Sequence, residues 1–234
     1  MKRNSDAHQR TGNRSLRVWG LAGCLWLAVA GNSAAASRIR FQDVVDHARQ
    51  LAGQPFQAPG RDLSEALKKI GYDEWRDIRF DPSQALWAGD KDLFTLQFFH
   101  PGFLYQYPVT VHAVDKSGVH PFPFTSKLFD YSQSALKGKV AGDPGFAGFR
   151  VHYPLNTPKY ADELVSFLGA SYFRALGKDM AYGMSARGLA INTAEDTGEE
   201  FPLFREFWVL RPQSGGKEIT IYAVLDSVSV AGAY

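Results

Sequence analysis

The sequence contains a single cysteine, Cys24, among 234 residues. One thiol forms no disulfide within a chain, and Cys24 lies in a stretch that we expect to be removed, so the mature protein has no disulfide or thiolate chemistry. The sequence therefore predicts that a large hydrophobic core stabilises the fold. With 45% hydrophobic residues, the composition is typical of a globular protein.

Apolar runs that would cross a membrane are also missing. The run from Val18 to Ala30 is too short to span a bilayer comfortably. It follows a basic stretch that ends at Arg17, and the small residues Ala34 to Ala36 come after it. This order predicts a Sec-type signal peptide over residues 1–36, with cleavage near Ala36 and no stable membrane insertion afterwards. Leu21 to Cys24 also resembles a lipoprotein cleavage box, but only a few apolar residues precede it.

The chain has no large excess of charge of either sign, since its formal net charge is +2. Its N-terminal 36 residues hold one acid, Asp6, and five basic residues: Lys2, Arg3, Arg10, Arg14 and Arg17. Without them the chain is slightly acidic. Nucleic acids and anionic membranes both require clustered positive charge, so the sequence predicts neither as a partner.

Motifs for nucleotide binding or nucleophilic catalysis are absent or incomplete. No phosphate-binding loop of the form GxxxxGK[ST] occurs, and the glycines of Gly142 to Gly148 fit a turn better than a dinucleotide site. Gly183 to Gly188 approaches the GxSxG elbow of hydrolases, but Arg187 stands where the second glycine belongs. Ser185 is therefore not expected to be a nucleophile.

Metal-binding patterns are missing as well. The histidines are scattered and lack the spacing of a zinc site; those after the signal peptide are His47, His100, His112, His120 and His152. The acidic stretch Glu195 to Glu200 lacks the alternating oxygen ligands of a calcium loop and predicts a solvated turn. We expect no metal and no cofactor.

The carboxylate pair of a glycosidase is not visible either. Such pairs lie roughly 5 to 9 Å apart. On a strand, Glu199 and Glu200 point to opposite faces, and Glu200 and Glu206 share a face but lie about 20 Å apart. No catalytic residue is assigned from the sequence.

Hydrophobic periodicity divides the chain into two regions. Apolar residues at helical spacing predict helices over Phe41 to Ala52 and Asp62 to Ile70, the second with a capping box from Asp62 to Glu65. From Asp77 onward, short β-branched and aromatic runs predict a mostly β, antiparallel sandwich. The expected strands are Ile78–Phe80, Leu93–His100, Val109–Val114, Phe146–Tyr153, Val165–Leu176, Gly188–Asn192, Phe204–Leu210 and Ile219–Leu225.

The strand over Phe204 to Leu210 alternates most clearly. We expect Phe207 and Val209 on one face, and Phe204, Glu206 and Trp208 on the other. Both faces are partly apolar, as in a strand that is covered by core on one side and by a ligand or second layer on the other. The chain ends abruptly at Tyr234, so we expect a C-terminally truncated open reading frame.

Aromatic and cationic residues gather in this β-rich half. Aromatic rings cover the apolar faces of sugars, and charged or planar groups hydrogen-bond adjacent hydroxyls. Tyr172, Tyr182, Arg187 and Trp208 have these properties and are the candidate substrate-binding residues, although the aromatic side chains also suit a core and Arg187 a structural ion pair.

A series of motifs resembles the periplasmic glucan biosynthesis family OpgG/OpgD, also called MdoG/MdoD. The motifs are Gly145–Phe149, Phe167–Arg174, Tyr182–Ile191, Gly198–Pro202, Phe207–Trp208 and Leu225–Tyr234. They occur in order, and the resemblance runs from about Phe41 to Tyr234. One departure is Asn192, where the family has aspartate.

The resemblance implies a periplasmic protein that acts on β-1,2-glucans with β-1,6 branches. It also implies a large galactose-mutarotase-like β-sandwich, of which residues 37–234 form the N-terminal part, followed by an immunoglobulin-like domain. Some members are similar to inverting β-1,2-glucanases, whose catalytic acid is expected beyond residue 234. Three hypotheses remain: a protein that binds and processes the glucan, a non-catalytic glucan-binding scaffold, and a nonfunctional truncated remnant. The glucan is the expected partner, with a second copy of the chain or the glucan-synthesis machinery as further candidates.

Overall fold

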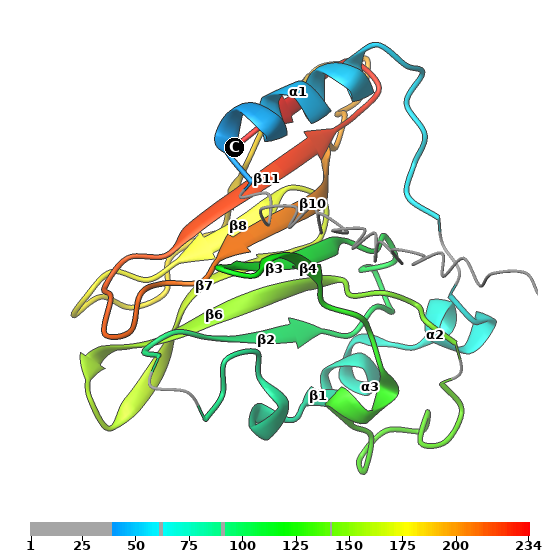
Figure 1. Ribbon diagram of the computed structural model, residues 1–234. Helices are drawn as coiled ribbons and strands as arrows, with labels where there is room; N and C mark the ends of the chain where they lie inside the picture. The colour runs from blue at the N-terminus through cyan, green and yellow to red at the C-terminus, as the bar shows by residue number, and fades with distance from the viewer. Residues whose placement is uncertain (1–38, 61–62, 90–91, 141) are drawn as a thin grey trace, which may run out of the picture. The chain divides into compact units, whose positions relative to one another are not determined.

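The computed structural model describes residues 39–60, 63–89, 92–140 and 142–234 (Figure 1). The predicted signal peptide, residues 1–36, lies outside the described residues. Among the helices in these ranges, none has the length and apolar character needed to cross a membrane.

Two five-stranded sheets form a sandwich-like body, as the sequence predicts (Figure 1). The first sheet has the order β12-β11-β10-β3-β4, with β3 Thr110–Asp115, β4 Gly118–Pro121, β10 Leu203–Leu210, β11 Thr220–Asp226 and β12 Ala231–Ala233. The second has the order β2-β6-β7-β8-β9, with β2 Thr95–Phe99, β6 Gly148–Thr157, β7 Tyr160–Leu168, β8 Tyr172–Ala175 and β9 Ala186–Arg187. Strands β1 (Arg79–Phe80) and β5 (Phe129–Asp130) form a separate pair. Neighbouring strands are antiparallel except β3 and β10, which are parallel.

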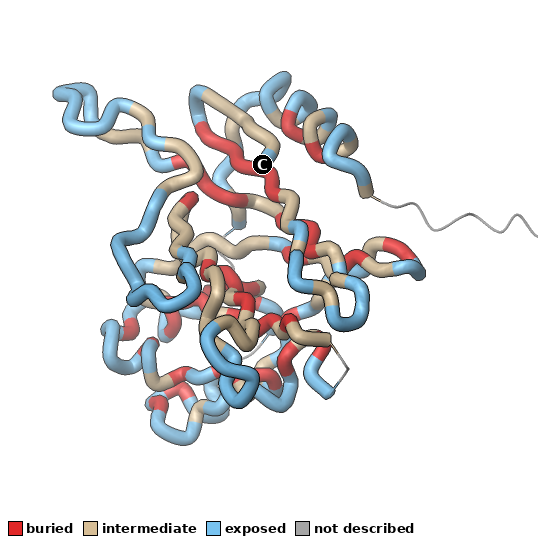
Figure 2. The backbone as a smooth tube through the Cα atoms, turned by 90° about the vertical axis from the view of Figure 1, so that its left-hand side faces the viewer, coloured by how far each residue is buried: buried red, intermediate tan, exposed pale blue. Residues whose placement is uncertain are grey.

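Phenylalanine rings fill the space between the two sheets. Phe149 of β6 and Phe207 of β10 are fully buried, and their ring centroids lie 5.0 Å apart. Phe167 of β7 packs against both. Figure 2 shows buried segments gathered in the interior and exposed loops around them. These contacts supply the large hydrophobic core that a chain without disulfides requires.

Helix α1 (Phe41–Ala52) covers the other face of the first sheet. Its bounds are those predicted, and Val44 and Ala48 are buried in a cluster with Trp208 and Val224. Figure 1 shows α1 lying over β11. The second apolar face of β10 is therefore covered by a protein layer, which is one of the two possibilities that its sequence left open.

A β-bulge in β10 changes the predicted alternation. The register with β11 shifts between Phe204 and Glu206, so Phe204 turns toward the same core as Phe207, with ring centroids 5.0 Å apart. The expectation that Phe204 shares a face with Trp208 was wrong, because a bulge inserts one residue and reverses the alternation before it.

The described part of the chain contains three short α-helices, where two were predicted. Helix α2 (Glu65–Lys69) is shorter than the expected segment, and its N-cap is Ser64, whose side chain accepts a hydrogen bond from the Leu67 amide. Asp62, the predicted cap, lies outside the described residues. Helix α3 (Tyr72–Arg76) was not predicted, since five residues are too few for a visible apolar stripe. Two 3₁₀ turns follow at Pro82–Gln84 and Ser126–Leu128.

Two of the predicted strands are not continuous strands in the structure. The expected strand from Val165 to Leu176 is a hairpin of β7 and β8, because Gly169 and Ala170 take positive φ values of 76° and 41°. In the expected strand from Gly188 to Asn192, only Ile191 forms an isolated bridge, with Glu200. Strands β4, β5, β9 and β12, the first half of β7 and the end of β6 beyond Tyr153 were not predicted.

Gly148 begins β6 where β7 comes very close. A Cβ atom at this position would lie 2.0 Å from the carbonyl oxygen of Phe167. Because that oxygen belongs to the backbone of the neighbouring strand, it has no rotamer by which to move away. Only glycine allows this approach of β6 to β7.

Replacing this glycine tests the close approach. We expect Gly148→Ala to lower the free energy of unfolding by about 2–3 kcal/mol, because the added methyl group pushes β6 from β7. Urea denaturation followed by circular dichroism measures this value. Gly60→Ala is the control, since its Cβ meets nothing within 4 Å. Equal unfolding midpoints for the two variants would contradict the account.

Candidate functional site

The outer face of the second sheet carries a row of polar side chains. Phe149 and Val151 of β6 point into the core, so Arg150, between them, points outward. Gln97 on β2, Arg150 on β6, Ser166 on β7 and Arg174 on β8 stand in register across four strands. Adjacent members therefore lie close enough to share one ligand.

A bulge brings Glu163 of β7 onto the same face. The register of β6 and β7 shifts between Val151 and His152, and His152 is paired with Glu163. Glu163 accepts hydrogen bonds from Arg150 Nη1 at 3.2 Å and from Arg174 Nη2 at 3.1 Å. Arg150 also donates through Nη2 to Gln97 Oε1 at 2.8 Å. The carboxylate thus lies between two guanidinium groups that come from the strands on either side.

This environment keeps Glu163 ionised. Burial alone would raise the pKa of its carboxyl group, but the hydrogen bond from Arg174 and the positive charge of Arg150 outweigh burial and hold the pKa below its ordinary value. An ionised carboxylate accepts hydrogen bonds and has no proton to give at neutral pH. Glu163 is therefore suited to hold hydroxyl groups and unsuited to act as a general acid.

Aromatic rings stand at both ends of this row. The Arg174 guanidinium lies 4.4 Å from the ring centroid of Tyr182, and the Tyr182 hydroxyl donates to the backbone carbonyl of Glu163. Tyr182 keeps 42% of its surface exposed. At the other end, the Arg150 guanidinium lies 5.5 Å from the Phe99 ring centroid. The row therefore combines charged hydrogen-bonding groups with aromatic faces.

Two adjoining hollows of about 300 and 260 Å³ follow the row. They share Arg150, Glu163 and Arg174 and are called here the central groove. Its lining includes Arg150, Glu163, Ser166, Tyr172, Arg174 and Tyr182. Its polar groups and aromatic rings suit an elongated, polyhydroxylated ligand.

The structure brings three of the four predicted substrate-binding residues together. Tyr172 and Tyr182 line the central groove. Arg187 of β9 pairs in register with Tyr172, and its guanidinium lies 5.8 Å from the Tyr172 ring centroid. Arg187 therefore lies beside Tyr172 at the border of the groove. It also forms an ion pair with Glu199, which is a structural contact.

Trp208 lies elsewhere. Only 7% of its surface is exposed, and it packs beneath α1, stacked on His112. His112 and His47 both contact the carboxylate of Glu206, which ties α1 to the sheet. The surroundings of Trp208 leave little ring surface for a sugar.

The structure also places the residues that were weighed as catalytic or metal-binding candidates. Glu200 accepts hydrogen bonds from Ser227 and Ser229 and so fixes the turn before β12, while Glu195 stays exposed. Ser185 lines the central groove. Within the described ranges, no group of three or more histidine, aspartate or glutamate side chains is arranged to hold a metal ion.

The sequence did not identify Arg150, Glu163 and Arg174. Polar residues alternate with Phe149 and Val151 in the sequence, and this alternation could have predicted that Arg150 faces outward. The position of Glu163 depends on a bulge, which no residue pattern specified. Its meeting with Arg150 and Arg174 also required the order of the strands.

Replacing Glu163 tests the electrostatic balance of the row. We expect Glu163→Gln to lower the free energy of unfolding at pH 7 by about 1–3 kcal/mol, because two guanidinium groups lose their charged acceptor. The folded-state pKa of Glu163 lies below its unfolded value, so this stabilisation is complete above pH 4.5 and is lost as the pH falls through the folded-state pKa. The two proteins should therefore converge in acid.

Denaturant titrations at several pH values measure this difference. Glu218→Gln, at an exposed position, serves as the control and should match the wild type throughout. A difference for Glu163→Gln that stays constant down to pH 3 would show that the carboxylate charge is not what stabilises the row.

Comparison with known proteins places the chain in a family. The model of the periplasmic glucan biosynthesis protein MdoG matches residues 39–234. Glucans biosynthesis protein G of Ralstonia nicotianae is 50% identical over 208 residues, which cover 89% of this chain and 41% of the relative. The protein of the same name from Vibrio cholerae is 48% identical over 191 residues, 82% of this chain and 35% of the relative. The chain thus spans less than half the length of these relatives. It belongs to the MdoG family of periplasmic glucan biosynthesis proteins, as its motifs implied.

Proposed function

We propose that this chain takes part in periplasmic glucan biosynthesis by binding a β-1,2-linked glucan chain along the central groove. The observation that carries the proposal is the row in which Glu163 lies between Arg150 and Arg174, with the Tyr182 ring 4.4 Å from the second guanidinium. Guanidinium groups donate to adjacent sugar hydroxyls and the carboxylate accepts from them. The exposed face of Tyr182 covers the apolar face of a glucose ring.

In this proposal Tyr172, Tyr182 and Arg187 are substrate contacts, and Arg150, Glu163 and Arg174 join them. Trp208 is left out because it lies beneath α1. The proposal also takes residues 37–234 as the N-terminal part of a sandwich domain and includes export with cleavage of the signal peptide near Ala36. The family membership supports a periplasmic location.

Glucan binding without cleavage is the role that this groove supports best. A general acid for glycoside hydrolysis needs a raised pKa, whereas the pKa of Glu163 is lowered. Incubating the purified full-length protein with linear β-1,2-glucan and measuring new reducing ends separates a scaffold from a glucanase. Binding without new ends favours the scaffold, and new ends would show a hydrolase.

Tyr182 provides the most direct test of the binding site. We expect Tyr182→Ala to weaken the binding of linear β-1,2-glucan about tenfold, because the stacking face is lost. Tyr182→Phe keeps the ring and should bind nearly as well as the wild type. Isothermal titration calorimetry measures both affinities.

Phe41→Ala is the matched control, since Phe41 is a similarly exposed aromatic residue on α1, at the first sheet. It should leave the affinity unchanged. An equal loss in Phe41→Ala and Tyr182→Ala, or no loss in Tyr182→Ala, would rule out the central groove as the binding site.

A further inference from the structure

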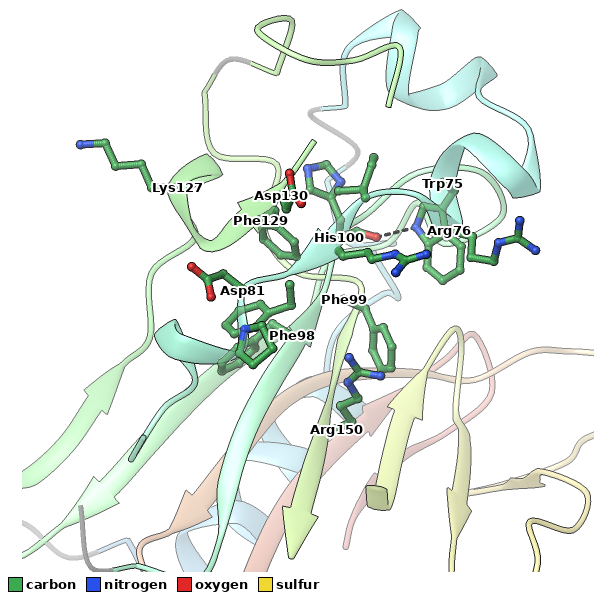
Figure 3. A pocket seen from close by; sticks show the side chains of 14 residues that line it. Trp75, Arg76, Asp81, Phe98, Phe99, His100, Lys127, Phe129, Asp130 and Arg150 are labelled. Atoms are coloured by element: carbon green, nitrogen blue, oxygen red, sulfur yellow. Dashed lines mark hydrogen bonds between the residues drawn. The ribbon is translucent and has the colours of Figure 1, made fainter. Parts of the chain in front are cut away.

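A larger hollow of about 740 Å³ adjoins the central groove at Phe99 and Arg150 (Figure 3). It is called here the α3 hollow, because it lies beside α3, between this helix, β1, β2 and β5. Its lining includes Trp75, Arg79, Asp81, Phe99, Asp130 and Arg150. Phe99 and Arg150 line the central groove as well, so a ligand that passes these two side chains enters both spaces.

The aromatic wall of the α3 hollow is held in place. The Trp75 indole NH donates to the backbone carbonyl of His100 at 2.7 Å, and the Phe99 ring lies against the Arg150 guanidinium. Figure 3 shows Trp75 and Phe99 on the same side of the hollow, with Asp81 on the opposite side. A fixed aromatic surface opposite polar groups offers one apolar and one hydrogen-bonding side to a ligand.

The charges of the lining favour a neutral ligand. Of its four cations, Arg76 is paired with Asp73 at 3.2 Å and Arg150 with Glu163, whereas Arg79 and Lys127 have no ion pair among the described residues. Two carboxylates, Asp81 and Asp130, balance these two remaining cations. An anion would be repelled by the two carboxylates and a cation by Arg79 and Lys127, so neither is favoured.

Hydrogen-bonding capacity remains on the two acids. Asp81 Oδ1 accepts from the amide and hydroxyl of Ser83, and Asp130 accepts from the amide and hydroxyl of Ser132. These bonds fix the carboxylates within their own turns and leave further lone pairs free. With the guanidinium of Arg79, the hollow offers both acceptors and donors, which are the groups that vicinal hydroxyls require.

We propose that the α3 hollow is a second saccharide-binding region, which receives the continuation of a glucan chain that bends around Phe99 and Arg150. The inference rests on the proposed function of the central groove. From Phe99 on β2 to Arg174 on β8 the groove crosses three interstrand spacings, roughly 14 Å, which suits a short oligosaccharide. Longer chains reach the α3 hollow and gain affinity there.

Chain-length dependence tests the proposal. Affinities for β-1,2-linked gluco-oligosaccharides of three and of eight units are measured by calorimetry with the wild type, Arg79→Ala and Asp81→Asn. We expect the wild type to bind the longer chain at least about tenfold more tightly. Each variant should lose about 3- to 10-fold in affinity for the longer chain and keep its affinity for the shorter one.

Arg49→Ala is the control, because Arg49 is an exposed arginine on α1 that pairs only with Asp46 in the described structure. It should match the wild type with both ligands, and thermal unfolding checks that all variants stay folded. Equal wild-type affinities for short and long chains would overturn the α3 hollow as a binding region. The proposal would also be overturned if both variants still bound the longer chain more tightly than the shorter one by the same factor as the wild type.

The two proposals fail in different ways. If the wild type binds neither oligosaccharide, the function proposed for the central groove fails. If it binds both and Tyr182→Ala weakens both, while Arg79→Ala and Asp81→Asn change nothing, the central groove stands and the α3 hollow is rejected.

Discussion

Phe149 and Phe207 meet between the two sheets, and the rest of the molecule depends on this contact. The chain has one cysteine, so apolar packing rather than covalent crosslinks has to hold the sheets together. Because side chains alternate along a strand, fixing Phe149 and Val151 in the core also fixes Arg150 on the opposite face. The same constraint that stabilises the sandwich therefore positions the first charged residue of the central groove.

Two of the register shifts in the sheets change this alternation at particular places. The bulge between β6 and β7 lets Glu163 face the groove and reach Arg150 and Arg174. The bulge in β10 turns Phe204 toward the core, where it packs on Phe207. One bulge thus supplies the groove with its carboxylate, and the other adds an aromatic ring to the packing between the sheets.

Trp208 illustrates how a residue type suits two environments. A tryptophan on a partly apolar strand face is compatible with a sugar platform and with a covered core position. Val44 and Ala48 of α1 decide between these, because they cover that face of the sheet. The contacts of His47 and His112 with Glu206 add polar ties between α1 and the sheet. The groove and the helix-covered face therefore belong to different sheets.

The sequence alone determined the β-rich class of the fold, helix α1, the positions of most long strands and, through its motifs, the family. These follow from periodicity and from residue types that lie close together in the chain. The sequence did not predict helix α3, the bulges or the division of Val165–Leu176 into a hairpin, because each depends on a few residues or on a backbone conformation. Only the tertiary structure brought Arg150, Glu163 and Arg174 together and placed Trp208 beneath α1, since strand order and layer packing decide which distant residues become neighbours.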